Sequence, residues 1–249
     1  MRIARDAAVL ELRDVSKYRE QGGIGFELEV PHLILPPGSF VSLVGESGCG
    51  KSTLLDLLAL VIRPNRCGTF RVCVGREPET IDVKALWDTE DESGLASLRR
   101  NYLGYVLQAG GLFPFLTVAQ NIVLPAQIRG LADYEKRIKG MAERMGVSTL
   151  LRKKPQYLSG GQRQRVAVLR ALANDPLIVL ADEPAAAVDR QRALSIVRDF
   201  RALATEEGST IVMATHDHEL IKGLADTTYT FRVEAVSKTL TRSVCLPVS

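Results

Sequence analysis

The sequence predicts an α/β fold with a mainly parallel core sheet, an antiparallel β subdomain and a helical subdomain. A short apolar run of strand type, 40–44, leads through a glycine-rich turn into a Leu-rich run of helix type. Two further apolar runs, 177–181 and 210–214, do not alternate, as is typical of parallel strands buried on both faces. Segments 8–14 and 26–35 alternate instead, which favours strands of an antiparallel sheet.

Composition indicates a soluble globular chain, and we expect one domain over residues 1–249. Of its residues, 46% are hydrophobic and 24% are charged. The formal net charge of +3 is too small to indicate a nucleic-acid partner or an anionic membrane surface. We expect no membrane-spanning segment, since no apolar run approaches the necessary length, and no apolar signal core. The four cysteines lack a metal-binding spacing, and we expect them to be reduced.

The turn after residues 40–44 has the pattern G-x-x-x-x-G-K-S, which predicts a phosphate loop. Its glycines let successive backbone N–H groups converge on phosphate oxygens, and the following helix N-terminus adds partial positive charge. Lys51 can reach the terminal phosphates, and the Ser52 hydroxyl can ligate Mg²⁺. The loop residues are Gly45, Glu46, Ser47, Gly48, Cys49, Gly50, Lys51, Ser52 and Thr53.

The middle of the chain predicts a surface excursion and several helices. Residues 76–98 are polar and acidic, and we interpret their acidic cluster as a solvated face rather than a metal site. A strand over 102–107 ends at Gln108, and helices follow over 117–124 and 131–151. Ser159 and Gln162 then form a capping box with two glycines between them. This helix start is either a second anion site or an ordinary capped helix.

Polar residues follow two of the buried strands. Asp182 and Glu183 end the strand 177–181, where ligands bind in open α/β sheets. Asp182 suits a water-mediated contact to Mg²⁺ and Glu183 can face an attacking water, although Asp and Pro also favour a plain surface turn. His216 follows the strand 210–214 at the same edge. An amphipathic helix over 189–207 and a strand over 227–233 complete the pattern, and the tail 235–249 shows no periodicity.

Together these motifs resemble the nucleotide-binding subunit of ATP-binding-cassette (ABC) transporters over about residues 10–235. The stretch Leu158-Ser159-Gly160-Gly161-Gln162 before an apolar strand ending Asp-Glu-Pro is the most specific part of the match. The resemblance implies a P-loop NTPase fold with a helical signature subdomain over about 109–168. It also implies ATP and Mg²⁺ as cofactors and ATP hydrolysis as the activity.

The resemblance implies a role for each matching residue. Tyr18 would stack on adenine, and Gln108 would link Mg²⁺ and the attacking water to the helical subdomain. Glu183 would polarise that water, and His216 would hold the γ-phosphate. Four signature residues would bind the γ-phosphate held by a second subunit, in a head-to-tail dimer around two ATP molecules. These four are Ser159, Gly160, Gly161 and Gln162.

The implied partners are this second ATPase subunit and an integral membrane permease docking near residues 110–116. They would place the chain at the cytoplasmic face of the inner membrane. Segments 98–106 and 112–122 look most similar to the lipoprotein-release and macrolide-export branch, which transmits force to the periplasm. Two alternatives stay open, a soluble ABC ATPase acting on DNA or ribosomes and an ATP-gated clamp with low turnover.

One segment departs from the family pattern. The loop Ala185-Ala186-Ala187-Val188-Asp189 keeps the family's Asp but lacks the hydroxyl side chains that usually cross the dimer interface. Each lost hydrogen bond is worth roughly 0.5–1.5 kcal/mol. We therefore expect weaker coupling between the two ATP sites, without loss of hydrolysis.

Overall fold

The structure, a computed structural model, describes residues 8–74, 79–108, 110–186 and 188–248. Within these ranges one continuous sheet has the strand order β5-β4-β1-β2-β10-β9-β3-β8-β7-β6. The strands are β1 (Leu10–Gln21), β2 (Ile24–Leu35), β3 (Phe40–Val44), β4 (Arg66–Val74), β5 (Glu79–Asp82), β6 (Leu103–Val106), β7 (Ile178–Asp182), β8 (Thr210–Thr215), β9 (Thr227–Ser237) and β10 (Leu240–Pro247). The α-helices are α1 (Lys51–Leu58), α2 (Val83–Asp88), α3 (Glu92–Tyr102), α4 (Val118–Arg129), α5 (Tyr134–Arg144), α6 (Gly160–Leu172), α7 (Arg190–Glu207) and α8 (His218–Ile221).

The half of the sheet from β9 to β6 is parallel, which confirms the predicted core. Residues of β7 and β8 alternate between two hydrophobic clusters. Leu180 and Val212 belong to a cluster that contains the leucines of α1, whereas Val179 and Met213 belong to a cluster with α4, α6 and α7. β7 and β8 lack alternating polar residues because both of their faces are covered.

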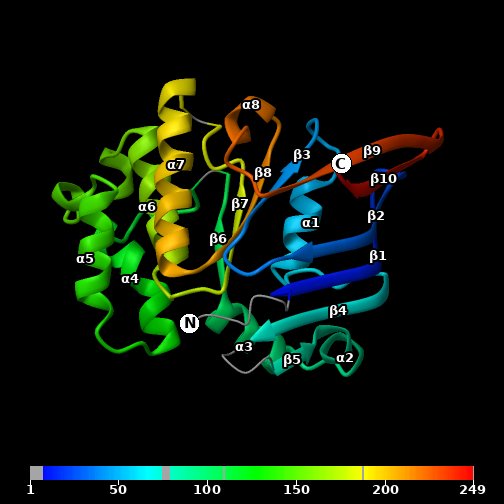
Figure 1. Cartoon of the computed structure of the whole chain (residues 1–249), viewed down its shortest axis with the longest axis horizontal. Helices are drawn as coiled ribbons and strands as arrows, with labels where there is room; N and C mark the ends of the chain where they lie inside the picture. Colours follow the sequence, from blue (N-terminus) through cyan, green and yellow to red (C-terminus); the bar gives the residue numbers. More distant parts are fainter. Residues whose placement is uncertain (1–7, 75–78, 109, 187, 249) are drawn as a thin grey trace.

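The other half of the sheet is mainly antiparallel, as the alternating segments predict. β1 pairs antiparallel with β2 and β4, and β4 pairs with β5. Leu12 of β1 and Leu33 of β2 are fully buried in the same cluster as Leu54 and Leu57 of α1. In Figure 1, α1 lies between the two halves of the sheet, and α4, α5 and α6 gather on the side away from β1 and β2.

The tail without periodicity contains β10, which joins the two halves of the sheet. β10 pairs antiparallel with β9 and parallel with β2. Half of this pairing is to a strand far away in the sequence, so a local pattern does not reveal it. Figure 1 shows β9 and β10 extending side by side beyond the rest of the sheet.

The acidic stretch is a surface structure, built from β5, α2 and α3. Asp91 caps α3 by accepting a hydrogen bond from the Gly94 N–H at 2.9 Å, and Asp88 pairs with Lys84 at 2.6 Å. No cluster of three or more His, Cys, Asp or Glu side chains suited to a metal occurs among the described residues. In the same described ranges, no helix has the length and apolarity needed to cross a membrane.

Candidate functional site

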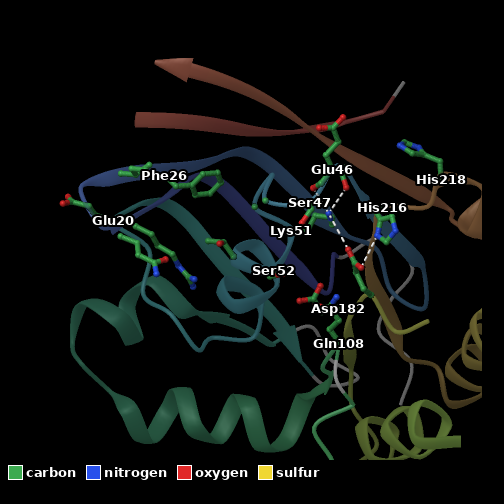
Figure 2. A pocket seen from close by; sticks show the side chains of 18 residues that line it. Glu20, Phe26, Glu46, Ser47, Lys51, Ser52, Gln108, Asp182, His216 and His218 are labelled. Atoms are coloured by element: carbon green, nitrogen blue, oxygen red, sulfur yellow. Dashed lines mark hydrogen bonds and ion pairs between the residues drawn. The ribbon is translucent and has the colours of Figure 1, made fainter. Parts of the chain in front are cut away.

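A cleft of about 1180 Å³ lies at the carboxyl ends of β3, β7 and β8, where ligands bind in open α/β sheets. The phosphate loop forms its floor, and Asp182, Glu183 and His216 lie along one side. Figure 2 shows Lys51, Asp182, Gln108 and His216 around this space, with Phe26 and Glu20 on the other side. The structure therefore brings together groups that lie on six separate segments of the sequence.

The phosphate loop adopts backbone angles that require glycine. Gly48 and Gly50 have φ values of 80° and 106°, in the region that L side chains rarely adopt. Gly45 is crowded instead, because a Cβ there would lie 2.6 Å from the Cys49 Sγ. α1 begins directly after Gly50 with no side-chain cap, so its first N–H groups face the cleft without a competing side chain.

Lys51 supplies positive charge to the cleft from a buried position. Its side chain is only 5% exposed, and Nζ donates to the carbonyls of Gly45 at 2.7 Å and Glu46 at 2.8 Å. Nζ also lies 3.9 Å from Glu183 Oε1. Carbonyl oxygens of the loop thus hold the ammonium over the loop itself, where it can meet the terminal phosphates of a nucleotide.

Asp182 and Ser52 provide oxygen ligands at the junction of β7 and α1. Burial raises the pKa of the Asp182 carboxyl, while a hydrogen bond from the Ser52 hydroxyl acts in the opposite direction. Mg²⁺ binds oxygen atoms and is usually held by one or two protein groups together with substrate phosphates. A hydroxyl and a carboxylate beside a phosphate loop fit that ion, and Gln108 lines the same cleft.

Glu183 and His216 form a contact pair beside Lys51. Glu183 Oε2 lies 3.1 Å from His216 Nδ1, and the Glu183 side chain is 15% exposed. The backbone of Glu183 has a φ of 43°, and its N–H donates to the carbonyl of Ala214 on β8 at 3.0 Å. A non-glycine residue in this region is strained and persists only when its surroundings hold it, which is common at functional sites.

Tyr18, which the resemblance implies would stack on adenine, is not among the residues that line the cleft. Asp14 has a φ of 52° and interrupts the alternation of β1. Leu10 and Leu12 face the core before it, and Val15 faces the core after it. The change of phase turns Tyr18 outward, where its side chain is 41% exposed and its hydroxyl is 3.0 Å from Glu20 Oε2.

Phe26 is an aromatic residue that lines the cleft, and the sequence pattern did not identify it as a site residue. It pairs in register with Arg19, and both residues line the cleft. Arg19 is fixed by a 3.0 Å ion pair with Asp56 of α1. Phe26 lies against the phosphate loop, since a Cβ at Gly50 would be 3.0 Å from the Phe26 Cζ. The signal was the alternation of β2, which places Phe26 on the same face as the buried Leu28.

The four signature residues at the start of α6 lie outside the lining of the cleft. Ser159 Oγ accepts from the Gln162 N–H at 3.3 Å, and Gln162 Oε1 accepts from the Ser159 N–H at 3.0 Å. The capping box is therefore formed, as predicted. Ser159 is exposed, and Gly160 and Gly161 are half-buried, so this helix end faces the surface of the chain.

The segment 110–116 presents aromatic side chains on a fixed backbone. Asn121 of α4, fully buried, binds the N–H and the carbonyl of Phe113 at 2.8 and 3.1 Å. Arg170 of α6 donates to the carbonyls of Gly110 and Gly111, and its guanidinium lies 5.9 Å from the Phe113 ring centre. Phe115 is 69% exposed. The segment is thus held rigidly while its apolar surface stays uncovered.

Known proteins are similar to this chain over most of its length. A family profile described as "ABC transporter" matches residues 28–186. The chain is 36% identical over 216 residues to an uncharacterised ABC transporter ATP-binding protein, MJ0796, of Methanocaldococcus jannaschii, covering 84% of this chain and 87% of that protein. It is also 36% identical to the macrolide export ATP-binding/permease protein MacB of Hyphomonas neptunium over 85% of this chain, which spans only 32% of that longer protein.

Solved structures agree with the sequence relatives. A dimeric structure of MJ0796, a bacterial ABC transporter cassette, matches with a TM-score of 0.74 and 32% identity, covering 89% of this chain and 93% of that one. A dimeric post-hydrolysis state of MJ0796 bound to ADP and Pi matches with the same TM-score at 31% identity and the same coverage. From the phosphate loop, the signature helix and these matches, it follows that the chain belongs to the ABC transporter family as one of its ATP-binding cassettes.

Proposed function

We propose that the chain is the ATP-hydrolysing motor subunit that drives a separate membrane permease. As an ABC cassette it binds and hydrolyses ATP. The observation that carries the proposal is the meeting of Lys51, Glu183 and His216 beside the phosphate loop. In that group each carboxylate oxygen of Glu183 faces one of the other two side chains. A site of this kind hydrolyses the γ-phosphate bond mainly by positioning and charge stabilisation.

The cleft accommodates ATP in one orientation. The phosphates lie over the loop and the start of α1, where N–H groups and Lys51 face them. Ser52 and Asp182 would hold Mg²⁺, with Gln108 nearby, and the bound ion would supply positive charge beside the phosphates. The base lies toward β1 and β2, where we assign its stacking contact to Phe26 in place of Tyr18.

Glu183 and His216 divide the chemistry between them. Glu183 accepts a hydrogen bond from the attacking water, and its strained backbone directs the side chain toward the loop. His216 donates to the γ-phosphate and keeps Glu183 oriented through their 3.1 Å contact. Lys51 stays on the phosphates as the bond to the leaving group breaks.

The signature helix implies a second subunit. An exposed, glycine-lined helix start binds an anion, yet the chain's own cleft does not include it. Two chains related by a twofold axis would place each signature over the ATP of the other, in line with the dimeric form of the matching structures. The loop 185–189 adjoins this face. Ala186 is exposed and Ala187 lies outside the described residues, so the weaker coupling expected from the missing hydroxyls stays a prediction.

The permease would dock on segment 110–116, whose exposed Phe115 provides an apolar contact. This partner places the chain at the cytoplasmic face of the inner membrane. The resemblance to MacB supports the force-transmitting branch, where cassette and permease share one name, "ATP-binding/permease". This chain spans about a third of the length of that protein.

The first experiment uses Glu183→Gln, which removes the base but keeps the shape of the side chain. We expect kcat for ATP hydrolysis to fall at least about 100-fold while nucleotide binding stays near that of the wild type. The tagged variant, isolated from its native membranes with ATP and Mg²⁺, should retain its partners. The matched control is the double variant Lys51→Ala/Glu183→Gln, which cannot hold the closed dimer and should release them.

The identity of the copurifying protein decides between the functions. A membrane protein of about four spans with a large extracytoplasmic domain supports the force-transmitting branch. A permease with many spans keeps the motor function but overturns that branch. Recovery of ribosomes or DNA alone overturns the transport proposal, and unchanged hydrolysis by Glu183→Gln means that Glu183 is not the base.

A further inference from the structure

The C-terminal strand β10 reaches the back of the phosphate loop. Ser243 of β10 is fully buried, and its Oγ donates a 2.6 Å hydrogen bond to the carbonyl of Cys49, inside the loop. The two residues are separated by 194 positions in the sequence. Ser243 is paired with Leu28 of β2 on one side and Val233 of β9 on the other. The hydroxyl therefore comes from a strand whose sequence gives no hint of the nucleotide site.

The geometry of the peptide unit gives this hydrogen bond a consequence in the cleft. In a trans peptide the carbonyl and the following N–H point in opposite directions. The carbonyl of Cys49 points to Ser243, so the N–H of Gly50 points away from β10, toward the cleft that Gly50 lines. Gly50 is also the N-cap of α1, with a φ of 106°. Its N–H is one of the donors that a phosphate group meets at this helix start.

Side chains from β2 and β9 support the same section of the loop. Phe26 and Leu28 of β2 lie close to Gly50, since a Cβ there would be 3.0 and 3.3 Å from their nearest atoms. Phe231 of β9 is equally close to Gly45. Arg242 fixes β10 against β2 through ion pairs with Glu27 at 3.3 Å and Glu29 at 3.4 Å. Side chains of β2 and β9 thus pack against the loop, and Ser243 adds a polar contact to it from β10.

We propose that Ser243 is a positioning residue for nucleotide binding, which orients the Cys49–Gly50 peptide so that the Gly50 N–H meets the phosphates. It touches no substrate atom and acts through the loop backbone. Without the Ser243 hydroxyl, the Cys49–Gly50 peptide loses the contact that fixes its direction. The Gly50 N–H must then be ordered when the nucleotide binds, and this ordering reduces affinity. The chemistry at Glu183 is unaffected, so the defect lies in affinity and not in the rate of the bound complex.

The test compares two alanine variants of the full chain that each remove one buried serine hydrogen bond. Ser243→Ala removes the contact to the loop. Ser209→Ala removes a 2.7 Å bond from a residue 1% exposed to the carbonyl of Pro176, at the start of β8 and away from the cleft. We expect similar losses of thermal stability. Only Ser243→Ala should raise the Kd for MgADP and the KM for ATP, by about three- to tenfold, with kcat within about twofold of the wild type.

Each outcome supports or overturns the proposal. A rise in Kd confined to Ser243→Ala supports it. An unchanged Kd in that variant, or an equal rise in Ser209→Ala, overturns it. Where Ser243→Ala does not fold, Ser243→Cys keeps the side-chain size with a much weaker donor and is judged by the same criteria. Binding of MgADP by the wild-type chain is measured alongside, so a failure of the nucleotide site itself is distinguished from a failure of the role of Ser243.

Discussion

The N-termini of α1 and α6 are both candidate anion sites, and they differ in whether side chains of the chain already bind their N–H groups. α1 follows a loop with glycines, α6 begins with Gly160 and Gly161, and both helices present N–H groups at their N-termini. At α1 the N-cap is Gly50, with no side-chain cap. At α6 the side chains of Ser159 and Gln162 already bind the backbone N–H groups of each other. The first helix end has free donors, whereas the second is partly satisfied by its own residues.

The surroundings of the two helix N-termini also differ, because one lies in a cleft and the other at the surface. α1 opens into a cleft of about 1180 Å³ that also contains the buried Lys51 and the carboxylates at the end of β7. α6 opens onto the surface, with Ser159 exposed. On the proposed function, the first helix end is the nucleotide site of the chain, and the second is one wall of the site of a partner subunit. One chain would then bind ATP alone and would still need a second chain for efficient hydrolysis.

Replacing Lys51 tests the α1 site and should have the largest effect. Lys51→Ala removes the charge that the carbonyls of Gly45 and Glu46 hold over the loop. We expect the Kd for MgADP to rise about 100-fold, because charged hydrogen bonds to phosphate are lost from a buried position. Isothermal titration calorimetry measures the change. Binding within about threefold of the wild type would contradict the assignment of the phosphates to this helix end.

Local motifs predicted which residues lie together in the cleft, whereas contacts between distant strands could not be predicted from them. The phosphate loop, Asp182, Glu183 and His216 each follow a buried strand, and parallel strands bring their carboxyl ends to one edge. The outward turn of Tyr18 depends on the positive φ of Asp14, which an alternating pattern does not reveal.

The contact of Ser243 with the loop was hidden for a similar reason. It depends on β10 lying beside β2, a pairing between the two ends of the chain. In both cases the missing information was the register and direction of a strand. The residue types were visible in the sequence, whereas the face to which each belongs was not.

Replacing Phe26 tests a second difference between the α1 and α6 sites. In the proposed function, the α1 site has an aromatic side chain that would contact the base of the nucleotide, and the α6 site has none assigned. Phe26→Ala should raise the Kd for MgADP about tenfold, since a stacked aromatic contributes roughly 1–3 kcal/mol. Tyr18→Ala is the matched control on the outer face of the neighbouring strand, and its Kd should stay within about twofold of the wild type. Competition with a fluorescent nucleotide measures both. The reverse order of effects would return the stacking role to Tyr18.

Replacing Ser159 tests the α6 site and should have the smallest effect. The chain offers a matched control, since Thr117 and Gln120 form the same capping box at the start of α4. Ser159→Ala and Thr117→Ala should lose similar stability, about 1 kcal/mol, because each removes one helix cap. Neither should change the Kd of the isolated chain for MgADP. Only Ser159→Ala should lower kcat for ATP hydrolysis, by about three- to fivefold, because on the proposed function the Ser159 hydroxyl would also contact the γ-phosphate held by the partner subunit. Equal kcat values for Ser159→Ala and Thr117→Ala would mean that the start of α6 is an ordinary capped helix end. The similarity between α6 and α1 would then be limited to the glycines at their N-termini.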